Sequence, residues 1–371
     1  MKIKRHSAAF AVLAAGALVL AGCGSDQNTP QGGGNPALDS LQLECGTKPV
    51  SGEGSSAQKN AVDVFARDYG LKCQGQNVNY TKSGSGKGVA AFTAGQVDFG
   101  GSDSPLNEEK GEVAKAAERC QGNPAWNLPM VFGPVAIAYN LEGVNDLTLN
   151  ADVIGKIYQG QIKKWDDPAI KALNPNAQLP STDIVPFFRS DESGTTENFQ
   201  KYLATATSGA WTGKGKTFQG GPGVGQGREG SDQVSQSVKA TPGAITYVEW
   251  SFAKNLQLGQ AKIDSGAGPV ELTTENVGKA IDGAQIEGEG HDLRVNLESI
   301  YGNKQPGVYP IVLNTYEIVC SKGYDPETAK AVKAFLTVAA NADPQQLQDA
   351  GYVPLPEGFK SKVTEAVNAI S

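Results

Sequence analysis

Four short segments of the sequence combine residue types that bind anions. They are rich in Gly, Ser, Thr and Asp and occupy residues 52–56 (GEGSS), 83–86 (SGSG), 100–103 (GGSD) and 189–195 (RSDESGT). Small residues let backbone N–H groups approach an oxyanion, and successive amides form a concave anion site. Helices predicted after the first, second and fourth segments would direct their N-terminal N–H groups to the same place. Each segment lies at a predicted strand end, where open α/β sheets bind ligands.

Two charged residues make these segments more specific than ordinary turns. The guanidinium of Arg189 offers a planar fork for two oxygen atoms. Asp103 adds a carboxylate to the same set of segments. Taken singly, a Gly/Ser segment more often caps a helix than binds a ligand, and Asp103 could itself be a helix N-cap. The combination favours an oxyanion-binding site.

The sequence lacks the usual signatures of an enzyme or a cofactor site. No Gly-x-Ser-x-Gly motif occurs, and His291, the only histidine besides His6, lies in a polar segment where we expect it to be solvated. Residues 225–230 fit G-x-G-x-x-G but follow no predicted strand, and residues 84–88 do not complete a Walker A motif. No C-x-x-C or histidine pair indicates a metal site. We therefore expect no catalytic residue, no cofactor and no metal.

Composition and charge describe an acidic globular chain. The 371 residues are 39% hydrophobic, and this length favours two domains. The 46 glycines are scattered, which excludes a collagen-like repeat. Lys plus Arg total 32 against 39 Asp plus Glu, a formal charge of −7 with no basic stripe, so no nucleic-acid partner is expected.

Strand and helix patterns alternate along the chain. Residues 130–140 (MVFGPVAIAYN) form a long apolar run with β-branched residues, which is typical of a buried strand. The Gly-rich stretch 213–230 has no regular period and is interpreted as a surface loop. The alternation predicts an α/β architecture. Further strands are predicted at 78–80, 184–188, 244–248 and 310–319, and helices at 326–340 and 357–370.

The first 22 residues resemble a bacterial lipoprotein signal peptide. Lys2, Lys4 and Arg5 form a positive n-region, and the apolar run 8–20 is too short to span a bilayer comfortably. The sequence Leu-Ala-Gly-Cys23 resembles a lipobox, so we expect cleavage before Cys23 and a diacylglycerol on its thiol. An ordinary secretory peptide with an incidental cysteine is the alternative. Cleavage removes three cations and no anions, which takes the formal charge from −7 to −10.

Four further cysteines suggest two disulfides. An even number of cysteines in an exported chain is typical of disulfide bonding, because that compartment is oxidising. Three pairings of Cys45, Cys73, Cys120 and Cys320 are possible. Cys45 lies just before the first predicted strand and Cys73 just after the first predicted helix, so both could lie at one end of a βαβ unit. We therefore favour Cys45–Cys73 and Cys120–Cys320.

Four motifs, in order along the chain, resemble one protein family. They are residues 97–103 (VDFGGSD), 158–168 (YQGQIKKWDDP), 189–195 (RSDESGT) and 242–247 (PGAITY). Together they resemble the phosphate-binding lipoproteins of bacterial Pst-type ABC importers, in particular the mycobacterial members. The resemblance extends from about residue 45 to the C-terminus. It implies the type II periplasmic solute-binding protein fold, an α/β structure with two lobes joined by a two-strand hinge.

The resemblance also implies how the chain is organised. Residues 24–40 are rich in Gly, Ser, Asn, Gln and Pro and have little to bury, so they are interpreted as a flexible tether. The chain is expected to cross between the lobes near residues 134–139 and 309–319. The expected parts are the signal peptide at 1–22, the lipid anchor and flexible tether at 23–44, lobe I at 45–135 plus 308–371, and lobe II at 136–307.

Residue by residue, the resemblance implies a set of phosphate ligands. Asp191 is expected to pair with Arg189 and to orient it. The chain departs from the family at three positions: Ala57 stands where an aromatic residue is usual, while Lys87 and Glu192 replace a small residue and a glycine. The expected ligands are Ser56, Ser85, Asp103, Arg189, Ser193, Gly194 and Thr195.

The charge of the chain agrees with phosphate as the ligand. An acidic protein cannot attract an anion through its overall field, so it must use fixed and desolvated donors. The carboxylate of Asp103 would repel an anion unless the ligand carries a proton to donate. Mono- and dihydrogen phosphate carry one, and sulfate at neutral pH does not, so an unpaired buried acceptor would disfavour sulfate.

We therefore expect a binding protein and not an enzyme. It would bind inorganic phosphate and deliver it to the transmembrane permease subunits of a phosphate ABC transporter. It would be a monomer, anchored by lipid to the outer face of the cytoplasmic membrane. The alternatives are another tetrahedral oxyanion, such as sulfate, or a phosphatase built on the same residues, which would need a nucleophile or a two-metal cluster.

Overall fold

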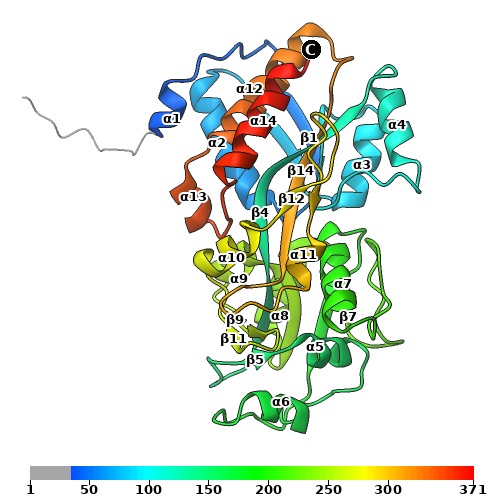
Figure 1. The fold of residues 1–371 in the computed structure, drawn as a ribbon, viewed down its shortest axis with the longest axis vertical. Helices are drawn as coiled ribbons and strands as arrows, with labels where there is room; N and C mark the ends of the chain where they lie inside the picture. Colours follow the sequence, from blue (N-terminus) through cyan, green and yellow to red (C-terminus); the bar gives the residue numbers. More distant parts are fainter. Residues whose placement is uncertain (1–34) are drawn as a thin grey trace, which may run out of the picture. The chain divides into compact units, whose positions relative to one another are not determined.

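A large mixed sheet is the central element of the fold (Figure 1). The computed structural model describes residues 35–371, so the signal peptide at 1–22, Cys23 and the tether up to residue 34 lie outside the described residues. The main path of the sheet runs β2–β1–β3–β14–β4–β8–β6–β7, and β9 (Gly259–Gln260) also pairs with β4. The strand bounds are β1 Val50–Gly54, β2 Val78–Thr81, β3 Phe99–Ser102, β4 Ala125–Asn140, β6 Val185–Arg189, β7 Gln226–Arg228, β8 Ala244–Glu249 and β14 Val312–Cys320.

Strand β4 connects the two halves of this sheet. Its residues 125–134 pair antiparallel with residues 312–320 of β14, and its residues 135–140 pair antiparallel with residues 244–249 of β8. Nearly all of β4 is buried, which explains its continuous apolar sequence, because a strand covered on both faces has no solvent side. The predicted α/β class is confirmed.

Helices cover both halves of the sheet (Figure 1). Short strands form a three-stranded sheet, from β5 (Thr148–Leu149), β10 (Lys262–Asp264) and β11 (Pro269–Val270), and a hairpin, from β12 (Gln285–Ile286) and β13 (Val295–Asn296). Within residues 35–371, none of the helices has both the length and the apolar character that crossing a membrane requires. The helices are α1 Pro36–Asp39, α2 Lys59–Lys72, α3 Ser85–Thr93, α4 Glu112–Arg119, α5 Ala151–Tyr158, α6 Pro168–Leu173, α7 Gly194–Ala206, α8 Gly230–Ala240, α9 Trp250–Asn255, α10 Thr274–Ile281, α11 Glu298–Tyr301, α12 Pro326–Ala340, α13 Pro344–Asp349 and α14 Glu357–Ala369.

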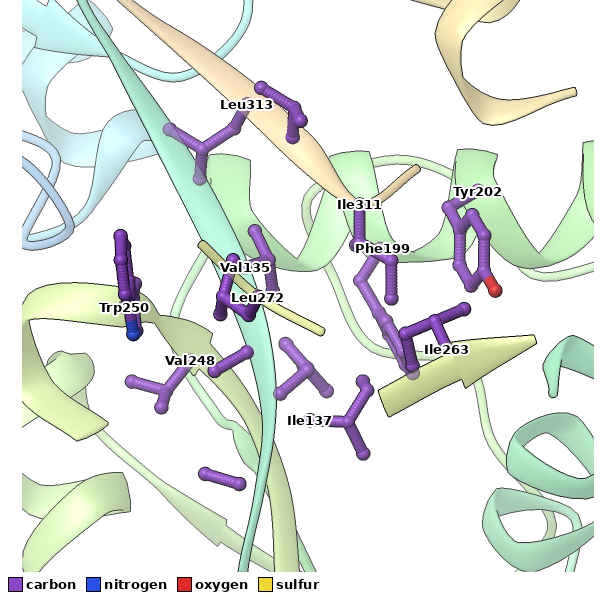
Figure 2. Close-up of a cluster of buried hydrophobic side chains, with 14 of the residues drawn as sticks. Val135, Ile137, Phe199, Tyr202, Val248, Trp250, Ile263, Leu272, Ile311 and Leu313 are labelled. Carbon is purple, nitrogen blue, oxygen red and sulfur yellow. The ribbon is translucent and has the colours of Figure 1, made fainter. Parts of the chain in front are cut away.

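Two clusters of buried side chains hold the helices on the sheet. One includes Val135 of β4, Phe199 of α7 and Val248 of β8 (Figure 2). In the other, the rings of Phe99 of β3 and Phe335 of α12 stack with centroids 5.2 Å apart. Each fully buried side chain of this size contributes about 1.5–3 kcal/mol relative to leaving it exposed. Both clusters include residues of the strands that carry the anion-binding segments, Phe187 of β6 in the first and Val50 of β1 in the second.

The described end of the tether packs against the folded body. Residues 35–44 include the short helix α1, whose Leu38 is buried, and the side-chain amide of Asn35 donates to the backbone carbonyl of Asn341 at 2.7 Å. This differs from the flexible tether expected at these positions. Leu38 belongs to the second cluster, and Leu41 and Leu43 are partly buried against it, although the average composition of the segment is polar.

Three other segments differ from the sequence-based expectation. Strand β4 begins at Ala125 rather than at residue 130, because residues with a weaker apolar pattern are recruited by pairing with β14. The stretch 213–230 is not only a surface loop, since β7 within it pairs parallel with β6. The ring of His291 is half-buried rather than solvated and lies edge-on against Trp126, with centroids 5.0 Å apart.

Two disulfides cross-link the half of the sheet that contains β1 and β14. Cys45 is bonded to Cys73 at the end of α2, and Cys120 at the end of α4 is bonded to Cys320 of β14. These are the pairs that the sequence analysis favours. The sequence separations are 28 and 200 residues. In the chain-entropy description, a cross-link that closes a longer loop removes more freedom from the unfolded chain.

Removing the Cys120–Cys320 bond should therefore cost more stability than removing the Cys45–Cys73 bond. The double variant Cys120→Ser/Cys320→Ser should lose about 1–2 kcal/mol more than Cys45→Ser/Cys73→Ser in the free energy of unfolding. Denaturant titrations of both variants under matched conditions measure the difference. A larger loss for the shorter loop would contradict the entropic account.

Candidate functional site

The four predicted anion-binding segments lie at the carboxyl ends of strands. Residues 52–56 end β1, residues 83–86 follow β2, residues 100–103 end β3, and residues 189–195 follow β6. Strand β1 pairs parallel with both β2 and β3, so the carboxyl ends of these three strands, and the first three segments with them, lie side by side. The fourth segment comes from the other half of the sheet and meets them there.

Ser85 joins the two halves of the site. Its Oγ accepts hydrogen bonds from the backbone N–H groups of Asp103 and Gly194, both at 3.2 Å. Gly194 is the first residue of α7, and the Oγ of Ser193 caps this helix by accepting from the N–H of Thr196. The structure brings together all seven expected ligands, and all are buried: Ser56, Ser85, Asp103, Arg189, Ser193, Gly194 and Thr195.

The carboxylate of Asp103 is surrounded by hydroxyl groups. Its Oδ1 accepts from the hydroxyls of Ser55 and Thr315, the latter at 3.0 Å, and its Oδ2 accepts from the hydroxyl of Thr195 at 3.1 Å. The residue is 2% exposed. Burial raises the pKa of Asp103, although the hydrogen bonds from Ser55 and Thr315 and the positive charge of Arg189 oppose that rise.

Asp103 does not cap a helix. The next helix, α4, begins at Glu112 with Gly111 at its N-cap, and the side chain of Asp103 has only hydroxyl partners. The N-cap alternative is therefore wrong. Each carboxylate oxygen can accept two hydrogen bonds, so Oδ1 is saturated and Oδ2 keeps one acceptor position for a ligand.

Arg189 is held in one orientation by Asp191 and by Ser231. The Nε of Arg189 donates to Asp191 Oδ1 at 2.7 Å and its Nη2 donates to Oδ2, while its Nη1 donates to Ser231 Oγ at 3.3 Å. Burial would raise the pKa of Asp191, but the hydrogen bonds and charge of Arg189, together with the N–H of Gly230, outweigh it and lower the pKa. A guanidinium carries five N–H groups, so two remain for a ligand.

The three departures from the family pattern lie beside the site or on its rim. The N–H of Ala57 donates to the Oγ of the serine two residues earlier at 3.1 Å, so it is not available to a ligand. Lys87 Nζ lies 2.8 Å from Glu229 Oε1, in an exposed ion pair between the two halves. The backbone carbonyl of Glu192 accepts from the N–H of Gly86 at 3.0 Å, so the two halves are hydrogen-bonded to each other at that point.

Sequence reasoning missed three residues of the site. Ser55 lies inside the first segment, next to an expected ligand, so a signal for it was present. Thr315 lies within the buried strand β14, and nothing in its spacing marks it. Ser231 follows the Gly-rich stretch that was interpreted as a loop, and only the pairing of β7 with β6 brings it to Arg189.

The arrangement is suited to binding an oxyanion that carries a proton. It offers two N–H groups of a fixed guanidinium, the N-terminus of α7 and one carboxylate acceptor in a buried site. Among residues 35–371, no group of three or more His, Cys, Asp and Glu side chains is placed to hold a metal ion.

Gly194 should not tolerate a side chain. A Cβ there would lie 2.6 Å from Ser85 Oγ and 2.7 Å from Asp103 Cβ, so Gly194→Ala should hold the two halves of the site apart. Phosphate binding should weaken by roughly tenfold to a hundredfold, the equivalent of an overpacking cost of about 1–3 kcal/mol. Calorimetry on protein stripped of ligand measures this change.

The matched control is Gly155→Ala in α5. Its new Cβ would meet nothing closer than Trp211 at 3.8 Å, so binding should not change. A Gly194→Ala variant that binds phosphate as tightly as the parent would contradict the role of this close approach.

Comparisons with known proteins place the chain in a family. A family model described as a PBP superfamily domain matches residues 27–343. The chain is 51% identical over 375 residues to the phosphate-binding protein PstS 3 of Mycobacterium tuberculosis, and the alignment covers 100% of both chains. It is 32% identical to the phosphate-binding protein PstS of Methanocaldococcus jannaschii, over 91% of this chain and 90% of the relative.

Solved structures share the fold. The phosphate-bound periplasmic phosphate-binding protein PfluDING superposes with a TM-score of 0.68 at 23% identity, over 86% of this chain and 93% of that chain. A phosphate-binding protein from Stenotrophomonas maltophilia gives a TM-score of 0.64 at 20% identity, over 86% and 94%. The chain therefore belongs to the PstS family of phosphate-binding proteins and has the type II solute-binding protein fold that its motifs predicted.

Proposed function

We propose that the protein binds inorganic phosphate outside the cytoplasm and delivers it to the transmembrane subunits of an ABC permease for import. The observation that carries this proposal is the buried Asp103 carboxylate in the same site as the free N–H groups of Arg189. Hydrogen phosphate complements both, since two of its oxygens can accept from the guanidinium while its O–H donates to Asp103 Oδ2. The printed names of the relatives, which are phosphate-binding proteins, support the same ligand.

We further propose that phosphate binding closes two lobes, 45–135 plus 308–371 and 136–307. Hydrogen bonds from Gly194 to Ser85 and from Thr195 to Asp103 join residues assigned to different lobes. An anion held by residues of both lobes must bridge them, and hinge closure is the usual response. Strands β4 and β14, which pass between the two halves, are suited to act as the hinge.

The proposed role is transport and not catalysis. A phosphatase on the same residues would need a nucleophile with a general base, or a pair of metals. Sulfate is the more relevant competitor, because it has the same shape and lacks a proton at neutral pH. The site would reject sulfate through the buried acceptor of Asp103, which would otherwise face an anion without a shared hydrogen atom.

Asp103→Asn should change the selectivity of the site. The amide removes the repulsion between like charges and adds a donor, so phosphate loses its proton acceptor while sulfate loses its chief obstacle. Calorimetry on stripped protein should show the ratio of phosphate affinity to sulfate affinity falling by at least about tenfold. If Asp103→Asn excludes sulfate as strongly as the parent, the proton-acceptor mechanism is wrong.

Arg189→Ala is the companion variant for that measurement. It removes the one full positive charge of the site and should weaken phosphate and sulfate together, by about 2–5 kcal/mol, with much less change in their ratio.

We also propose that the mature protein is anchored to the outer face of the cytoplasmic membrane through a lipid on Cys23. The proposal rests on the lipobox in the sequence, since Cys23 lies outside the described residues. Cys23→Ser should give soluble or unprocessed protein in a detergent-phase partitioning experiment. Unchanged partitioning into the detergent phase would contradict the anchor.

A further inference from the structure

The motif G-x-G-x-x-G at residues 225–230 has a place in the structure that the proposed function does not yet explain. Its central part is β7, which pairs parallel with β6 so that Arg228 lies opposite Arg189. The chain then enters α8 at Gly230 (Figure 1). The register of β7 against β6 therefore places the first turn of α8 beside the guanidinium of Arg189.

The four consecutive residues 229–232 at this turn all contact residues in or beside the site. Glu229 forms an ion pair with Lys87, and Asp232 forms one with Lys82, both lysines coming from the other half of the structure. The N–H of Gly230 donates to Asp191 Oδ1 at 3.1 Å. The ion pairs are partly exposed, so each contributes little to stability. Ser231, between them, is the buried member of the set, at 1% exposed.

Ser231 touches two of the expected phosphate ligands at once. Its Oγ accepts from Nη1 of Arg189 at 3.3 Å and lies 3.0 Å from the Oγ of Ser56. The backbone N–H of Ser231 also donates to Ser56 Oγ at 3.0 Å. Ser56 and Arg189 come from different halves of the sheet, so Ser231 is a direct bridge between them.

Either hydroxyl can be the donor in the pair formed by Ser231 Oγ and Ser56 Oγ. The hydrogen bond from the charged guanidinium of Arg189 polarises the Ser231 hydroxyl and makes it the stronger donor of the two, so the Ser231 proton is assigned to Ser56 Oγ. Ser56 Oγ then accepts two hydrogen bonds, one from the N–H and one from the hydroxyl of Ser231. A serine hydroxyl has two acceptor positions and one donor, so the proton of Ser56 is left for the ligand.

We propose that Ser231 is a positioning residue of the phosphate site: it holds one N–H of Arg189 and turns the hydroxyl proton of Ser56 toward the bound anion. The proposal rests on the proposed phosphate function and adds a residue to that site. Ser231 thereby links one donor from each half of the sheet, Arg189 and Ser56.

Calorimetric titration of inorganic phosphate into the stripped full-length mature protein tests the proposal. Ser231→Ala leaves one N–H of Arg189 without its partner and frees the hydroxyl of Ser56 to rotate. The dissociation constant should rise by about tenfold to a hundredfold, the range for losing a hydrogen bond to a charged group. A rise of less than about twofold would overturn the proposal.

Ser235→Ala is the matched control on the same helix. Ser235 is also 1% exposed, but its hydroxyl donates to the backbone carbonyls of Ser231 and Asp232 within α8. Ser235→Ala should leave the phosphate dissociation constant unchanged, and it should alter thermal stability about as much as Ser231→Ala does. If both variants weaken phosphate equally, the effect belongs to the stability of α8, and the positioning role is wrong.

A double-mutant cycle with Ser56→Ala separates positioning from a general structural effect. If Ser231 acts partly through Ser56, the dissociation constant of the double variant should rise by less than the product of the fold-increases of the two single variants. Full additivity would overturn the link from Ser231 to Ser56. A parent protein that does not bind phosphate would instead refute the proposed function, so the two failures are distinguishable.

Discussion

A carboxylate and a guanidinium buried in the same site place the strictest demand on this structure. Asp103 is 2% exposed and Arg189 is 3% exposed, so neither charge has bulk water to solvate it. An ion without such solvation costs several kcal/mol unless hydrogen bonds replace the water. The fold replaces it with hydroxyl groups around Asp103 and with Asp191 and Ser231 around Arg189. The surrounding elements supply these partners.

The partners of Asp103 come from strands that are distant in sequence. Ser55 follows β1, Thr315 lies within β14, and Thr195 lies in the first turn of α7. Strand β14 lies between β3 and β4 in the sheet and pairs Tyr316 with Ser102, so it carries Thr315 to the end of β3, which Asp103 follows. The same strand pairs with β4 along most of its length, and β4 continues into the other half. The strand that supplies a hydrogen bond to the Asp103 carboxylate is thus also paired with the strand that connects the two halves.

The proposed selectivity and the proposed closure depend on the same contacts. The chain is acidic, with a formal charge of −7, so the site must act through fixed donors at short range and not through the field of the whole protein. Those donors are complete only when both halves meet, because Ser85 accepts from Gly194 across them and Ser231 bridges Arg189 and Ser56. In the proposed closure, a ligand that satisfies the Asp103 acceptor and the Arg189 donors would therefore stabilise the contacts between the two halves as well.

The sequence by itself determined the α/β class, the two disulfide pairs and the segments that converge on the site. These follow from local features: the alternation of apolar runs, small residues at strand ends, and the motifs around Asp103 and Arg189. The start of β4, the burial of α1 and the roles of Thr315 and Ser231 depended on the tertiary structure. Each of these depends on pairing between segments that are far apart in the chain. A threonine in a buried strand, or a serine after a Gly-rich stretch, acquires its partner only when the sheet places another strand beside it, and no local pattern encodes that placement.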